Sequence, residues 1–469
     1  MRSPVFFIIA AAVGAAVFLI ARLIGNDYLF FAGYTVLQFI VLATAWNILG
    51  GYCGYVNFGS AAFFAVGAYS TVALHKLGTN IDRYAAESIA PLLHAIMPLS
   101  IPTLTVIAGV VAGLIGFGMG YLTLRLRGAF FAIATLALAV VLQTLIVNWD
   151  YVGGSRGAYI IRPQTVPIIG SYIQYLFLLM VVLAVVALTV ARVIERSRLG
   201  YGFATIRDDE LAAEACGVPT LRLKLIATTI SGGLMGMAGA SFPYYIGYLE
   251  PSSAFGLAYA VNSIAMPMIG GTTMWAGPLI GALLLGIIQQ IATVTISSAV
   301  NLLIVGLLLI GFVIMAPSGI VGMVKDFLRV AAPGRLDRRA IRLLSIAGYV
   351  FLVGLGGVVF GLSAAMAAKG PILTGLGVFT LVLSLVYLAA AYGLLKLGSW
   401  SPLLTVAVLA TSLPLSLIFI WLDPSRFNVI GLSIAAAIDV VAIWLLQNPD
   451  IKRLYRPVST PLSERQAVS

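Results

Sequence analysis

Residues Ile206–Leu225 read IRDDELAAEACGVPTLRLKL, and they concentrate charge in a chain that has little of it. Seven of these twenty residues are charged, whereas charged residues make up 9% of the whole sequence. Strongly hydrophobic runs lie on both sides of the stretch. A charged segment between two long apolar runs is typical of a loop that joins two membrane-spanning helices.

The composition of the whole chain agrees with that interpretation. Of its 469 residues, 61% are hydrophobic, and the mean hydropathy is +1.07. Apolar runs of about 20 residues, the length that spans a bilayer, recur along the chain. They lack the alternation of a β-barrel, so the sequence predicts an all-α polytopic membrane protein. The run Val5–Ile24 is too long for a signal peptide and no small-residue cleavage site follows it, so we expect a retained span.

The apolar runs predict about ten spans in a core, and about four more after a basic stretch. The core spans are 5–24, 28–49, 57–76, 103–124, 128–147, 171–191, 224–246, 257–270, 278–297 and 300–316. The later spans are 343–364, 372–395, 401–421 and 427–446. These spans divide the chain into a core (1–322), a basic cytoplasmic junction (323–342), a four-span extension of unknown role (343–446) and a cytoplasmic tail (447–469). Span 257–270 is short for a bilayer crossing, which indicates a broken or re-entrant helix.

Basic residues set the predicted orientation. With the N-terminus in the cytoplasm, 20 of the 27 Lys and Arg residues fall on the cytoplasmic side and seven on the outer side. This bias places both termini and residues 206–225 on the cytoplasmic side of the membrane. It also explains the net charge of +11 without nucleic-acid binding, whose usual sign is a basic patch on a soluble module.

The charged loop itself is expected to form a short surface helix. Asp208, Asp209 and Glu210 suit a helix N-terminus, and Gly217 followed by Pro219 suits a helix end. Leu211, Ala212 and Ala215 would share one face of this helix. The plainer interpretation is a solvated connection without a partner.

Several chemistries are disfavoured by what the sequence lacks. Asp439 is the one acidic residue inside a predicted span, and it belongs to the extension, so the core has no intramembrane acid to relay protons. This weakens a secondary transporter, although backbone carbonyls could still hold sodium. No lysine follows a glycine, which excludes a phosphate-binding loop, and we find no nucleophile elbow or zinc motif. The sequence predicts no catalytic residue, no metal ligand and no Cys53–Cys216 disulfide.

Two glycine-rich breaks occupy comparable places in two halves of the core. They are NILGGYCGYVNFGSAAFFAVGAY (Asn47–Tyr69) and MIGGTTMWAGPLIGALLLGI (Met268–Ile287). Paired interrupted helices in two repeats indicate a substrate path between them. The polar and glycine residues that we expect along this path are Asn47, Asn57, Ser60, Gly270, Gly271 and Thr272. The alternative is that the polar side chains only satisfy freed backbone groups. The GxxxG pairs elsewhere in the spans are explained by close helix packing.

Residues from about 28 to 322 resemble the LivM-type permease of branched-chain amino acid ABC importers. Four segments carry the resemblance: Gly51–Tyr69, Leu124–Ala139, Asn148–Gly157 and Ile269–Gly286. The opening stretch resembles the family's coupling loop, a form of the EAA motif. Its residues here are Arg207, Glu210, Ala212, Ala213, Glu214 and Gly217.

The resemblance implies a transport subunit that is not an enzyme and binds no cofactor. It implies two cytoplasmic ABC ATPase subunits that use ATP and Mg, a second LivH-like permease subunit, an external substrate-binding protein and surrounding membrane lipid, but no nucleic acid. The substrates would be branched-chain or related amino acids. Asn57 stands where members often have Ser, and Ser60 where they often have His or Gln, so urea or short amides remain open as substrates. The runner-up is a secondary transporter of small polar solutes, and a structural membrane protein is third.

The predicted topology can be tested at a native cysteine. Cys216 should be protected from a membrane-impermeant thiol reagent in intact cells, because the basic bias places its loop in the cytoplasm. Labelling of Cys216 from outside intact cells would overturn the predicted orientation.

Overall fold

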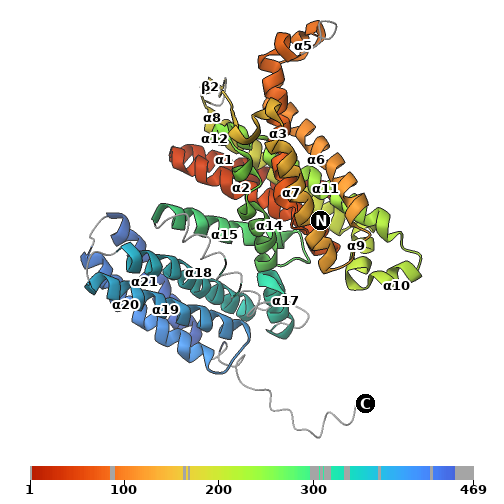
Figure 1. The fold of residues 1–469 in the computed structure, drawn as a ribbon. Coiled ribbons are helices and arrows are strands. Elements are labelled where there is room, and N and C mark those ends of the chain that lie inside the picture. The colour runs from red at the N-terminus through yellow and green to blue at the C-terminus, as the bar shows by residue number, and fades with distance from the viewer. Residues whose placement is uncertain are drawn as a thin grey trace. The chain divides into compact units, whose positions relative to one another are not determined.

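A computed structural model of the chain describes residues 3–84, 90–161, 165–166, 170–295, 306, 310, 318–331, 338–367, 371–422, 426–448 and 451. It is dominated by helices and divides into two compact units (Figure 1). Unit 1 comprises Met1–Gln290 and Val305–Val321, and unit 2 comprises Ile291–Ile304 and Gly322–Ser469. The prediction of an all-α polytopic membrane protein is confirmed.

Unit 1 contains the long helices of the predicted core together with short connecting elements. Its helices are α1 (Ser3–Ile24), α2 (Asp27–Asn47), η1 (Ile48–Tyr52), α3 (Ser60–Thr79), α4 (Ile81–Tyr84), α5 (Ala90–Ile96), α6 (Ile101–Thr123), α7 (Ala129–Val147), η2 (Asp150–Val152), η3 (Gly154–Arg156), α8 (Tyr172–Glu195), α9 (Arg198–Asp208), α10 (Glu210–Ala215), α11 (Thr220–Ala240), α12 (Phe242–Ile246), α13 (Pro251–Ala254) and α14 (Leu257–Gly270). Helices α15 (Ala276–Thr295) and α17 (Gly319–Ala331) each run across a boundary between the units. Two small antiparallel pairs join β1 (Ala158–Tyr159) to β4 (Tyr248–Leu249) and β2 (Thr165–Val166) to β3 (Gly170–Ser171).

Nine helices among the described residues are long and apolar enough to cross a membrane. Helix α3 forms over most of predicted span 57–76 but is less apolar than these nine. Twelve of its residues are buried inside the protein, where a helix face meets other helices instead of lipid. Helix α14 has the predicted limits, and α13 precedes it to give a longer apolar segment, Pro251–Gly270. Predicted span 300–316 lies outside the described residues except at positions 306 and 310.

Small residues bring α3, α6 and α11 into close contact. A Cβ added to Gly67 of α3 would lie 2.0 Å from the carbonyl oxygen of Gly236 in α11. A Cβ added to Gly236 would lie 2.2 Å from the Cβ of Ala112 in α6. Backbones approach so closely only where side chains are absent or very small. The glycines of these helices therefore allow close helix packing, as the sequence predicted.

Loops of unit 1 gather at two opposite ends, as alternating spans require. At one end, Lys76 at the end of α3 donates to the carbonyl of Tyr151 at 2.7 Å, and β1 pairs with β4. At the other end, the segments that follow α2, α6 and α8 meet one another (Figure 1). The second end contains residues 206–225, and we call it the α10 end.

Unit 2 is built on four helices of the predicted extension: α18 (Arg338–Ala367), α19 (Pro371–Leu395), α20 (Ser401–Leu422) and α21 (Arg426–Gln447). Asp439 of α21, the acid that falls inside a predicted span, is buried and has hydroxyl partners. Tyr349 of α18 donates to Asp439 at 2.8 Å, and Ser412 of α20 is hydrogen-bonded to the other carboxyl oxygen. Asp439 thus links three helices of this unit.

Candidate functional site

The charged loop forms two helices instead of the single helix that we expected. Helix α9 extends through Asp208, and Asp209 then adopts an extended conformation with φ −160° and ψ 109°. The Asp209 carboxylate caps α10 by accepting a hydrogen bond from the amide of Ala212 at 3.0 Å. Asp208 therefore ends one helix while Asp209 and Glu210 begin the next. Gly217 has φ +82°, a left-handed conformation that suits glycine at a helix end, as predicted.

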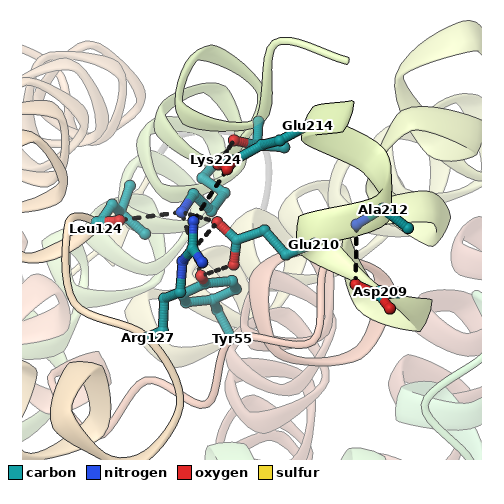
Figure 2. A network of polar contacts seen from close by, with 9 residues as sticks. Tyr55, Leu124, Arg127, Asp209, Glu210, Ala212, Glu214 and Lys224 are labelled. Atoms are coloured by element: carbon teal, nitrogen blue, oxygen red, sulfur yellow. Dashed lines mark hydrogen bonds and ion pairs between the residues drawn. The ribbon is translucent and has the colours of Figure 1, made fainter. Parts of the chain in front are cut away.

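A buried ion pair fixes α10 to the body of unit 1 (Figure 2). Lys224 lies one turn inside α11, is 3% exposed, and contacts the Glu210 carboxylate at 2.7 Å. Its ammonium also donates to the carbonyl of Leu124 at 3.0 Å and to the Tyr55 hydroxyl at 3.1 Å. Tyr55 in turn donates to the other oxygen of Glu210. Groups from three separate connections between helices thus pair with the polar atoms of the two residues. A buried charge requires such partners.

Three further contacts extend this network toward the surface. Arg127, in the connection between α6 and α7, lies 3.7 Å from Glu210 and 3.0 Å from Glu214. Thr220 donates to the other carboxyl oxygen of Glu214 at 2.8 Å. Because Arg127 and Glu214 are about half exposed, their pair contributes little to stability compared with the buried pair.

The electrostatics of Glu210 follow from these contacts. Burial acts to raise the pKa of its carboxyl, but the hydrogen bonds from Lys224 and Tyr55 and the nearby positive charges outweigh burial and hold the pKa below its ordinary value of 4.5. A carboxyl whose pKa is lower in the folded state stabilises the fold above its ordinary pKa. That contribution is lost as the pH falls below this value.

The outer face of α10 is small and apolar. Leu211 is 64% exposed, and Ala212, Glu214 and Ala215 are exposed beside it. Ala213 is buried and packs toward the chain itself, so it offers no outer surface. Arg207 is ion-paired to neighbouring Asp208, and its aliphatic part packs against Gly54. Of the predicted loop residues, Ala212 and Glu214 therefore face outward, while Glu210 and Ala213 hold the helix in place.

A cavity of about 360 Å³ lies beside this network. Its lining comes from the segment after η1, from the start of α7 and from Glu210: Gly54, Tyr55, Val56, Gly128, Ala129, Ala132 and Glu210. Apart from Tyr55 and Glu210, these residues are small or aliphatic.

The two glycine-rich breaks meet near the α10 end. The first contains a π-helix, η1, whose Gly51 lies against the second break: a Cβ added to Gly51 would be 2.6 Å from the carbonyl oxygen of Thr272. Gly271 has φ +117°, and Gly270 packs directly against the backbone of Gly277. We call the approach of Gly51 to Thr272 the inner contact.

The other predicted path residues differ in their surroundings. The Asn57 side chain accepts a hydrogen bond from the amide of Gly59 at 2.7 Å, which is the local role that we considered as the alternative. Ser60 is hydrogen-bonded to Ser263 of α14 at 2.8 Å, so it joins the two halves. Asn47 is buried next to Tyr52, yet its amide atoms have no hydrogen bond of normal geometry within the described part of the chain. Whether these residues line a substrate path stays a prediction.

A second anchor holds the second break. Glu195, at the end of α8, accepts a hydrogen bond from the backbone amide of Trp275 at 2.9 Å. The guanidinium of Arg192 lies 5.4 Å from the Trp275 ring centre and 5.6 Å from that of Phe6 in α1. The segment between α14 and α15 is therefore tied to the end of α8, where the charged connection begins.

Sequence reasoning missed Tyr55, Lys224, Glu195 and Trp275 as parts of this site. Lys224 carried a signal, because a lysine inside an apolar helix needs a partner. Tyr55 gave none, since nothing in a lone aromatic residue of a glycine-rich segment indicates a contact 155 positions away.

This fold, with interrupted helices in contact and a charged connection anchored at one end, is that of a polytopic α-helical membrane protein. A family model described as "Branched-chain amino acid transport system / permease component" matches residues 28–313. The match covers more than half of the chain, and the chain belongs to this family of permease components. The predicted resemblance is thereby confirmed, and the family role is that of a transport subunit instead of an enzyme.

Individual relatives are more distant. The chain is 26% identical over 317 residues to the high-affinity branched-chain amino acid transport system permease protein LivM of Escherichia coli (strain K12), which covers 62% of this chain and 69% of the relative. It is 25% identical over 283 residues to a probable branched-chain amino acid transport permease protein LivH of Methanocaldococcus jannaschii, covering 57% and 83%. No solved structure matches. The family match ends at residue 313, before the part of unit 2 that runs from Gly322 to Ser469.

The buried ion pair should matter much more for stability than the exposed one. Replacing Lys224 with Met leaves the Glu210 carboxylate with only Tyr55 and Arg127, and should destabilise the protein by about 3–5 kcal/mol. Replacing Glu214 with Gln should cost about 1 kcal/mol or less. Thermal unfolding in detergent at neutral pH measures both, and adding Glu210→Gln to Lys224→Met should recover part of the loss. Equal effects of the two single substitutions would contradict this view of the site.

Proposed function

We propose that this chain is the permease subunit of an ABC importer that translocates branched-chain or related amino acids. The observation that carries this proposal is the structure of α10. Its exposed face has mostly small or apolar side chains, and a buried ion pair holds the helix in a fixed position. A connecting loop without a partner has no need of a buried Lys–Glu pair to fix its orientation. A helix that transmits force from a partner needs one, because only a fixed contact can bias a conformational equilibrium.

The partners follow from this role. Two cytoplasmic ATPase subunits would receive α10 and would use ATP and Mg, while an external binding protein would deliver the substrate at the opposite end. A second, LivH-like permease subunit would complete the membrane part, surrounded by lipid. The chain would lie in the plasma membrane of a prokaryote, with both termini and the α10 end in the cytoplasm. Relatives named as LivM and LivH support a system of several components.

The surface of α10 suggests how an ATPase binds. Leu211 is the large apolar side chain of its exposed face, and Ala212 and Ala215 leave room for close approach beside it. Arg127 and Glu214 provide a charged edge. Central apolar side chains surrounded by polar groups are the usual composition of a specific interface.

Substitutions on α10 should abolish coupling without disturbing membrane insertion. Leu211→Ser and Glu214→Lys should each lower substrate-stimulated ATP hydrolysis and uptake together by about tenfold or more, the effect of losing one central interface contact. Gly217→Val should act similarly, because Gly217 has a φ of +82° that a β-branched residue adopts only with strain. The effect would not come from a steric clash, since no atom lies within 4 Å of the added Cβ. Reconstituted uptake, ATP hydrolysis and co-purification of the ATPase are the measurements.

The matched control is Leu257→Ser. Leu257 is as exposed as Leu211, at 64%, but begins α14 at the opposite end of unit 1. This variant should keep hydrolysis and uptake coupled and retain the ATPase. Normal uptake by Leu211→Ser, Glu214→Lys and Gly217→Val would show that α10 is a solvated connection without a partner.

A further inference from the structure

Tyr55 lies within the first glycine-rich break and connects α10 to η1 through two separate hydrogen bonds. Its hydroxyl donates to Glu210, and its backbone amide donates to the carbonyl of Leu49 inside η1 at 3.1 Å. The ring is held edge-on to Phe131 of α7 at 5.0 Å and under the ammonium of Lys224 at 4.7 Å. Tyr55 is 7% exposed, so a displacement of Glu210 acts on a side chain that cannot simply turn into solvent.

The second glycine-rich break is bonded to the other end of the charged segment between α8 and α11. Glu195 directly precedes this connection and holds the amide of Trp275, while Glu210 lies near its far end and holds Tyr55. The two breaks touch each other at the inner contact between Gly51 and Thr272. One segment, residues 195–210, is therefore bonded to both sides of this contact.

The first break contains features that suit a rearrangement. A π-helical turn such as η1 adds a residue to a helix and is often found at functional sites. Asn47, which lies against Gly51, is 1% exposed, and its amide lacks a hydrogen bond of normal geometry to any described residue. Its neighbour Tyr52 is also buried, so few strong hydrogen bonds hold this part of the break in one arrangement.

We propose that Tyr55 is a positioning residue for transport: it converts movement of α10 on its partner into separation of the two glycine-rich breaks at the inner contact. Glu195 and Trp275 hold the second break while Tyr55 moves the first. This inference rests on the proposed function, and it adds the route by which docking at α10 reaches the substrate path.

The chain carries a native reporter for each of the two steps. Cys216 is exposed at the end of α10, so a docked ATPase should protect it. Cys53 follows η1 directly and is 0% exposed, and burial raises the pKa of its thiol to about 12, so it should react slowly while the breaks are closed. Cys53 and Cys216 are the two cysteines of the sequence, and mass spectrometry of their peptides separates the signals.

The experiment uses the complete transporter in lipid nanodiscs with a small thiol reagent, in the absence of nucleotide and with ATP and vanadate. In the native protein, labelling of Cys53 should differ between these two states by about tenfold or more, the change expected when a buried thiol becomes accessible. In Tyr55→Phe, which keeps the ring but loses both hydroxyl contacts, this difference should disappear while Cys216 stays protected. Uptake should fall by about tenfold, as expected for the loss of a hydrogen bond to a charged group, with ATP hydrolysis within about twofold of normal.

Tyr151→Phe is the matched control, since that hydroxyl donates to the carbonyl of Ala73 at 2.9 Å at the opposite end of unit 1. It should change neither Cys53 labelling nor uptake. A nucleotide response of Cys53 that persists in Tyr55→Phe, or that is absent in the native protein, overturns the role of Tyr55. Loss of Cys216 protection in the native complex would instead reject docking at α10, and with it the proposed function.

Discussion

The contact between Lys224 and Glu210 is the interaction on which the α10 end depends. A charged lysine one turn inside an apolar helix is tolerable only with a carboxylate and further acceptors around it, and here Glu210, Tyr55 and the Leu124 carbonyl supply them. Satisfying this one charge draws the segments after α2, α6 and α8 to the start of α11. The position of α10 is therefore set by the cost of burying a cation.

Close backbone contact is the second constraint, and it explains why the glycines lie where they do. The contacts of Gly67 with Gly236 and of Gly51 with Thr272 leave no space for a Cβ. In a bilayer, apolar side chains gain little from leaving lipid, so helix association relies on such close packing. The packed helices hold the ion pair in a fixed position. The two interrupted helices are the places where we propose that the structure rearranges.

The sequence alone predicted the helices well, because each span must bury about 20 residues of backbone in lipid. It also identified α10 and its end at Gly217, since helix caps depend on local chemistry. It indicated Glu210 as a residue at the start of this helix, but it did not show that the Glu210 side chain turns inward to Lys224. Tyr55 and Trp275 were missed for a related reason: their partners lie 155 and 80 positions away along the chain, and no local pattern reports such contacts.

Hydrogen exchange of the complete transporter tests this account most directly. Lys224→Met should increase amide exchange both in α10 with the turn that follows it, residues 210–217, and in the first break, residues 48–58, because one ion pair positions both. Strands β1 and β4, at the opposite end of unit 1, should keep their protection in the same sample. If α10 loses protection while residues 48–58 do not, or if neither segment changes, the buried pair does not organise this end of the protein.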